Sequence, residues 1–224
     1  MKTSPSHDPL PIVLLVITVT SGLVDAVSYL GLGHVFTANM TGNVVFLGFA
    51  LGGSHDVSIT ASLVALGGFL FGALCGGRVV AKDARATLPF ILALEIVLLA
   101  SGACVAAFTD ARGALARGVL LVLLSMPMGL QNAAVRRLAV ADMTTTVLTL
   151  TLTGIAADSS LAGGDNARIG RRCAAVVAML SGALVGAVLL RYGLAWTIAA
   201  AAVGDAAALG GVVLAQRDQP GGSR

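Results

Sequence analysis

The residues best suited to chemistry gather in one short stretch of the sequence, FTANMTGN, at positions 36–43. Polar side chains alternate along it, with one glycine near its end; these residues are Thr37, Asn39, Thr41, Gly42 and Asn43. Alternate residues point the same way in extended chain, whereas in a helix Asn39 and Asn43 share a face. Either arrangement gathers hydroxyl and amide groups that suit a small solute or an ion. The alternative is an ordinary polar contact between helices.

Three acidic residues, Asp25, Glu95 and Asp205, stand inside long apolar runs. A charge at the centre of a membrane helix costs about 2.5–3.5 kcal/mol on insertion scales, so such residues face a partner or a wet cavity. One interpretation is proton or cation coupling, with Glu95 and Asp205 as counterparts. The other is that these groups are protonated, or hydrogen-bonded to neighbouring helices.

A second polar stretch reads TTTVLTLTLTGIAA, in which Thr149, Thr151 and Thr153 alternate with leucine and Gly154 follows. The alternation resembles a strand, but an unpaired strand in lipid would leave its backbone groups unsatisfied. We therefore predict a distorted helix or a re-entrant loop that faces FTANMTGN. A purely structural role is the alternative, because threonine hydroxyls return hydrogen bonds to helical carbonyls. Gln131 and Asn132 lie at the end of the preceding apolar stretch and join either network.

Several classes of protein are not expected. The sequence has no Ser-His-Asp arrangement, metal-ligand cluster or phosphate-binding glycine loop, so we expect neither an enzyme nor a bound cofactor or metal. Its net charge is +3, but its 14 Lys and Arg residues lie singly or in small groups between apolar runs. No basic stripe is formed, and nucleic acid is not an expected partner.

The composition predicts an all-α polytopic membrane protein with one membrane domain over residues 1–224 and a polar tail at 217–224. Charged residues make up 11% of the chain, against about 25% in soluble domains. A span needs about 20 apolar residues. Two shorter apolar segments carry Thr-Gly, namely Phe36–Gly52 and Thr144–Ala157. Six stretches qualify as spans: Pro9–Leu30, Ile59–Val80, Leu88–Phe108, Ala114–Ala134, Cys173–Leu190 and Leu194–Ala215.

The distribution of positive charge selects among topologies, because short cytoplasmic loops collect Lys and Arg. With eight spans the two sides hold six and eight of these residues. With six spans, and with both Thr-Gly segments entering and leaving on one side, the division becomes eleven against three. We therefore predict six transmembrane helices plus two re-entrant or broken segments, with both termini cytoplasmic. Eight or seven spans are the alternatives.

The chain also resembles itself at a distance of about 110 residues. SGLVDAVSYL at 21–30 aligns with MGLQNAAVRR at 128–137, Thr41-Gly42 with Thr153-Gly154, and Glu95 with Asp205. The halves are approximately 9–110 and 114–216, and three spans in each half would make the second half inverted. Inverted repeats with discontinuous helices are a recurring transporter plan.

Glycines recur every four residues in both halves, in positions that let helix backbones approach closely. They are Gly68, Gly72 and Gly76, then Gly182 and Gly186. Packing is the expected role. Whether they pack within one chain or in a homo-oligomer stays open.

The stretch GLVDAVSYLGLGHVFTANMTGNVVFLG resembles the YoaK family of bacterial inner-membrane proteins, and GLQNA followed by a threonine-rich stretch ending in Thr-Gly agrees. The resemblance implies a multi-pass protein of the cytoplasmic membrane and supplies no substrate, because the family is a domain of unknown function. Its motif includes Asp25, Asn39, Thr41, Gly42 and Asn43.

The expected function is transport of an unknown small solute or ion across the lipid bilayer, with acidic residues binding or coupling a cation. The alternative is a non-transporting scaffold or accessory protein whose polar groups satisfy each other.

Overall fold

The computed structural model describes residues 9–81, 83–111, 113–138 and 148–217, and these form helices joined by short connections. One 3-10 turn, η1, covers Ser160–Ala162. Two helices are short: α2 (Met40–Leu51) and α6 (Leu148–Ala157). Six are long, namely α1 (Leu10–Gly31), α3 (Ile59–Val79), α4 (Ala84–Phe108), α5 (Ala114–Leu138), α7 (Ile169–Leu189) and α8 (Leu194–Arg217).

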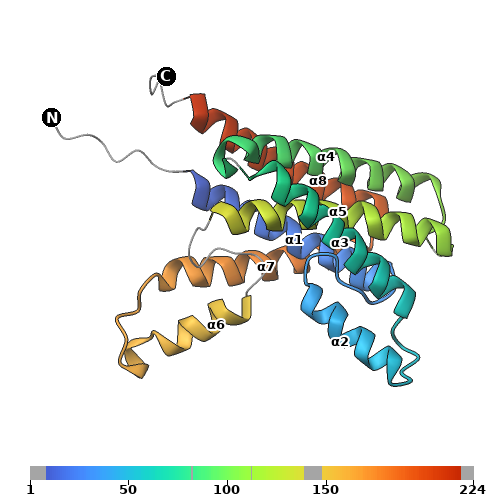
Figure 1. The fold of residues 1–224 in the computed structure, drawn as a ribbon, viewed down its shortest axis with the longest axis horizontal. Coiled ribbons are helices and arrows are strands. Elements are labelled where there is room, and N and C mark those ends of the chain that lie inside the picture. Colours follow the sequence, from blue (N-terminus) through green and yellow to red (C-terminus); the bar gives the residue numbers. More distant parts are fainter. Residues whose placement is uncertain (1–8, 82, 112, 139–147, 218–224) are drawn as a thin grey trace.

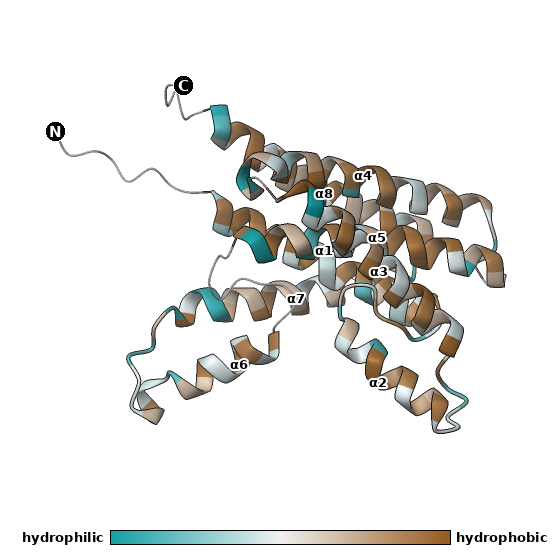
Figure 2. Ribbon diagram, viewed as in Figure 1, coloured by the Kyte–Doolittle hydropathy of each residue, from teal (hydrophilic) through white to brown (hydrophobic). Residues whose placement is uncertain are grey.

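The six long helices are long and apolar enough to cross a membrane. Figure 2 shows apolar residues along these helices, while hydrophilic residues gather near helix ends and connections. The short helices have 12 and 10 residues, which at 1.5 Å per residue gives at most about 18 Å. A bilayer core is about 30 Å thick, so neither short helix crosses it. The prediction of a six-span all-α membrane protein is confirmed, and the eight-span alternative is not supported.

The short helices lie on one side of the bundle, near its opposite ends, and their first residues are turned toward each other (Figure 1). The chain leaves α1 at one end of the bundle, turns inward before α2, and returns to that end before α3. Helix α6 runs outward in the same way at the other end, before α7. Residues 144–147 of the predicted second segment lie outside the described residues.

The described arginines are divided unequally between the two ends of the bundle. The end at which α1 begins and α8 ends carries Arg78, Arg85, Arg136, Arg137, Arg168, Arg171, Arg172 and Arg217. The other end carries Arg117 and Arg191. Four further residues of the predicted count, Lys2, Lys82, Arg112 and Arg224, lie outside the described part of the chain, as do residues 218–224 of the predicted tail.

Helices α1 and α5 form the most buried part of the bundle. Helix α7 packs on α1, α3 packs on α5, and α4 packs on α8. Helices α4 and α5 also pack together, as do α8 and α1, and the short helices α2 and α6 lie on α3 and α7. This set of contacts is unchanged when α1–α4 are exchanged for α5–α8.

Glycines bring the paired helices into backbone contact. Gly72 of α3 lies directly against the backbone of Met126 in α5, and Gly182 of α7 lies in the same way against Val19 in α1. A shift of 110 residues relates the two glycines, and a shift of 107 relates their partners. The same shifts relate two further contacts, Gly76 with Leu130 and Gly186 with Leu23, and Gly68 meets Ser125. These glycines therefore pack within one chain.

Candidate functional site

Asp25, near the end of α1, holds the non-helical segment that precedes α2. Its Oδ1 accepts hydrogen bonds from the backbone N–H groups of Thr37 (2.8 Å) and Ala38 (2.7 Å), and its Oδ2 accepts from Asn39 Nδ2 (2.7 Å). The carboxylate is buried. Backbone that leaves a helix at membrane depth needs such partners, because lipid offers none. Asp25 therefore supplies the hydrogen-bond acceptors that the N–H groups of this non-helical segment need.

Asn43 fastens the same segment from the other side. Its Oδ1 accepts a hydrogen bond from the Phe36 N–H (2.8 Å), and its Nδ2 donates to the Phe36 carbonyl (2.6 Å). Gly42 leaves room for the Phe36 ring, because a Cβ at position 42 would lie 2.6 Å from a ring carbon and would force the ring to shift. Thr37 is buried beside Ser28, while Thr41 is on the exposed side of α2. Much of the predicted binding stretch thus holds its own fold, and Thr41 points elsewhere.

Aromatic rings attach α2 to the end of α1. The ring of Phe36 stacks on Tyr29 with centroids 5.1 Å apart, and on Phe46 at 5.7 Å. His34, with a φ of 58°, lies edge-on to Tyr29. Stacked pairs add about 0.5–1.5 kcal/mol beyond the area that they bury, so this cluster fixes the angle at which α2 returns. Sequence reasoning missed it, although Tyr29, Phe36 and Phe46 stand close together in a chain with few aromatic residues.

A groove of about 490 Å³ opens beside this segment. Its lining residues with polar groups are Asp25, Tyr29 and Asn39, and Leu148, the first described residue of α6, faces the same space. The rest is apolar and comes mainly from α1 and α7. The beginnings of both short helices therefore meet one groove. Helix N-termini carry a partial positive charge, and Asp25 lies beside the start of α2.

The threonines of α6 do not reach this groove among the residues that the structure describes, since α6 contributes Leu148 alone. Thr151 is buried, whereas Thr149 and Thr153 are exposed and the Thr153 hydroxyl donates to the Thr149 carbonyl (2.9 Å). The physical reason is helical spacing, which separates residues that alternation would place on one side. Among the described residues, the threonines of α6 therefore do not line the groove beside FTANMTGN, and their part in binding stays a prediction.

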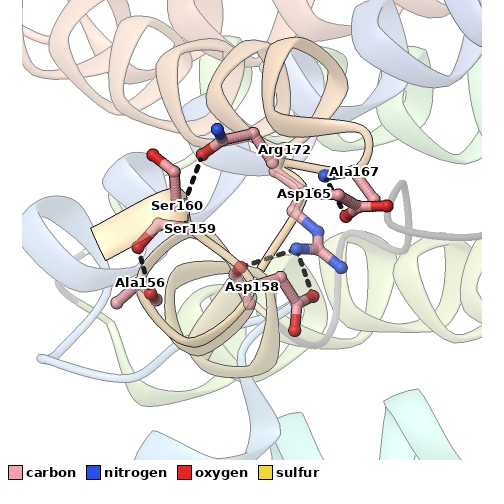
Figure 3. Close-up of polar contacts among 9 residues, drawn as sticks. Ala156, Asp158, Ser159, Ser160, Asp165, Ala167 and Arg172 are labelled. Atoms are coloured by element: carbon pink, nitrogen blue, oxygen red, sulfur yellow. Dashed lines mark hydrogen bonds and ion pairs between the residues drawn. The ribbon is translucent and has the colours of Figure 1, made fainter. Parts of the chain in front are cut away.

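Gly154 has a different neighbour from its predicted counterpart Gly42. Arg172 of α7 donates from Nη1 to the Gly154 carbonyl (2.6 Å) and to Asp158 Oδ2 (2.7 Å). Figure 3 shows Arg172 reaching Asp158. It also shows further hydrogen bonds within the connection between α6 and α7. A Cβ at position 154 would lie 2.7 Å from the guanidinium carbon. This arginine, which sequence reasoning missed, fastens the end of α6 to α7.

A second polar cluster lies at the centre of the bundle. Glu95 of α4 and Asp205 of α8 are both fully buried. The Thr20 hydroxyl reaches Asp205 Oδ1 at 2.8 Å, the Ser21 hydroxyl reaches Gln131 Oε1 at 3.0 Å, and Gln131 Nε2 lies 3.5 Å from Glu95 Oε2. The structure thus brings predicted residues from both halves together and adds Thr20 and Ser21. Their only sequence signal is polarity inside an apolar run that contains Asp25.

Asn132, the predicted counterpart of Asp25, has a different hydrogen-bond partner from Asp25. It is buried, and its Nδ2 donates to the Met128 carbonyl (2.7 Å) in its own helix.

Fold and site together define a polytopic all-helical membrane protein with buried polar groups along its central helices. The family model described as "Protein of unknown function (DUF1275)" matches residues 13–211, and the chain belongs to this family. The chain is 40% identical over 151 residues to the UPF0700 transmembrane protein YoaK of Bacillus subtilis (strain 168), an alignment that covers 66% of each protein. The resemblance to the YoaK family is confirmed. No solved structure matches the chain.

Proposed function

We propose that this protein is a permease for a small solute or an ion, and that the solute passes through the groove beside Asp25 and Asn39. The observation that carries the proposal is the convergence of two half-length helices on that groove. Non-helical backbone inside a membrane occurs where it is buried in protein or lines a cavity. Half-helices that meet near the midplane form substrate sites in many transporters.

The relation between the halves supports the same proposal. The matching contacts of Gly72 and Gly182, and of Gly76 and Gly186, are those expected of two copies of one three-span unit. Helices α1 and α5 run in opposite directions (Figure 1), as inverted copies would. Inverted repeats permit alternating access, because one half rocks against the other around a fixed site.

The arginine distribution gives the proposed orientation. Cytoplasmic loops are enriched in Lys and Arg, so the end bearing Arg136, Arg137 and Arg172 faces the cytoplasm. Both termini then lie on the cytoplasmic side of a bacterial inner membrane.

A scaffold or accessory protein is the second candidate, and one observation favours it. Both carboxylate oxygens of Asp25 already accept hydrogen bonds from its own loop, as expected if the polar groups only support the fold. Against it, the glycines predicted to mediate association, such as Gly72 and Gly182, already pack against other helices of the same chain.

Uptake by proteoliposomes separates the two candidates. A panel of labelled amino acids, sugars, organic cations, Na⁺ and K⁺ is offered to the wild type, to Asp25→Asn and to Asn39→Ala. We expect at least one compound to enter, and its flux to fall about tenfold or more in both variants, as when about 1.4 kcal/mol of stabilisation is lost. Ser101→Ala, an exposed hydroxyl on α4, is the matched control and should keep the flux.

Flux that survives both groove variants would show that the groove is not the route. A wild type that moves no member of the panel, while the protein inserts normally, would favour the scaffold.

A further inference from the structure

The central cluster around Glu95 and Asp205 is separate from the groove and has no role in the solute path described above. Both residues are 0% exposed, and they come from α4 and α8, which pack against each other. Adjacent residues of α1 link the two carboxyl groups, because the Thr20 hydroxyl reaches Asp205 and the Ser21 hydroxyl reaches Gln131, whose Nε2 lies 3.5 Å from Glu95 Oε2. Two like charges in a medium of low dielectric constant repel each other strongly. The pair therefore needs a group that neutralises one charge or screens the two from each other.

The cluster has fewer hydrogen-bond donors than acceptors. The Thr20 hydroxyl has one hydrogen but lies 2.9 Å from the Ile17 carbonyl and 2.8 Å from Asp205 Oδ1. The Ser21 hydroxyl likewise lies within hydrogen-bond distance of two acceptors, the Ile17 carbonyl (2.8 Å) and Gln131 Oε1 (3.0 Å). A hydroxyl donates only once, so each can serve one of its two acceptors at a time.

Two carboxyl oxygens remain without any partner among the described residues, Glu95 Oε1 and Asp205 Oδ2. The contact from Gln131 Nε2 to Glu95 Oε2 is long, at 3.5 Å. A buried acceptor without a donor destabilises the folded protein, and it does so more strongly when the acceptor is charged. The cluster therefore has acceptors to spare and lacks donors.

No cationic side chain of the neighbouring helices is near the pair. The charged or titratable residues on α1 are Asp25 and Tyr29, which lie at the groove. The arginines of α4, α5, α7 and α8 occupy the first or last turns of their helices. Arg85 lies ten residues from Glu95, and Arg217 lies twelve from Asp205, which is about 15–18 Å along a helix.

We propose that Glu95 and Asp205 form a proton-binding site at the centre of the bundle. A proton taken from water converts one carboxylate into a carboxylic acid. On Asp205 Oδ1 this proton donates to the Thr20 oxygen, and the Thr20 hydrogen is then free for the Ile17 carbonyl. The proton removes one charge and supplies one of the missing donors. Coupling of this site to solute movement rests on the proposed permease, whereas proton binding does not.

Infrared difference spectroscopy tests the site without any substrate. Purified protein in lipid is stepped between acidic and alkaline buffer, and the carbonyl stretching band of protonated carboxylic acid is recorded. We expect a band in the wild type that is lost or reduced by half or more in Glu95→Gln and in Asp205→Asn. Asp56→Asn, an exposed residue of the connection before α3, should keep it.

A band that persists unchanged in both variants would overturn the proposal. So would a band that responds to added Na⁺ but not to pH, because the pair would then bind a metal cation. If one variant fails to insert, the other decides alone. A wild type without flux that keeps the band would favour the scaffold and leave the proton site standing.

Discussion

At the scale of single residues, Asp25 combines a buried charge with three hydrogen bonds to the segment before α2. Replacement by alanine would leave the N–H groups of Thr37 and Ala38 without an acceptor. Each orphaned donor costs about 1–3 kcal/mol. Replacement by asparagine keeps one oxygen for those N–H groups, and the Asn39 amide can turn to offer its own oxygen to the new Nδ2.

We therefore expect Asp25→Ala to lower the free energy of unfolding by about 3 kcal/mol, and Asp25→Asn to lower it by less than half as much. Unfolding in mixed micelles measures both, with exposed Asp56→Ala as the control. Equal losses in the two variants would contradict the anchoring role.

The sequence predicted Asp25 because a charge in an apolar run demands a partner. It did not identify that partner, because the N–H groups that donate to Asp25 lie 12 and 13 residues further along the chain, in a segment without regular structure. The sequence predicted only part of the cluster at Glu95, and the reason is related. Thr20 and Ser21 are ordinary helix residues until the packing of α1 with α8 and α5 brings them to the acids.

At the scale of helices, glycine contacts set how closely α7 approaches α1. A Cβ at Gly182 would overlap the backbone of Val19, and backbone cannot turn aside as a side chain can. Gly77 of α3 has open space around it. Alanine is otherwise the better helix former by about 1 kcal/mol, so the same substitution should have opposite effects at these two positions.

We expect Gly182→Ala to destabilise the protein by about 1–3 kcal/mol, the usual cost of overpacking, and Gly77→Ala to be neutral or slightly stabilising. Thermal unfolding in detergent measures both shifts. A neutral Gly182→Ala would mean that α1 and α7 are not in backbone contact.

Hydropathy predicted the six long helices but placed several ends by composition alone. Helix α4 begins at Ala84, four residues before the predicted Leu88, because Asp83 accepts hydrogen bonds from the N–H groups of Arg85 and Ala86. In the predicted segment Phe36–Gly52 only the part from Met40 is helical. Apolar character runs through the whole segment, whereas the bonds of Asp25 and Asn43 decide where the helix starts.

At the scale of the whole molecule, the number of spans and the positions of the arginines depend on each other. The two half-length helices return to the end from which they came, so each half contributes three crossings. Eight described arginines then share one end and two share the other. Counting charges on the sequence reached the same arrangement, because the rule depends only on the order of loops.

This topology places Ser54, between α2 and α3, and Asp165, between η1 and α7, on opposite faces of the membrane. Single cysteines at these positions are introduced into a chain whose Cys75, Cys104 and Cys173 are replaced by alanine. A membrane-impermeant maleimide should label Ser54→Cys in intact cells and Asp165→Cys only after permeabilisation, because the proposed orientation places the arginine-rich end in the cytoplasm. Reversed labelling would contradict the proposed orientation, or would mean that α2 crosses while α6 does not. Labelling of both positions from one side would require α6 to cross completely, because α3, α4, α5 and α6 lie between them, and the 10 described residues of α6 are too few for a crossing.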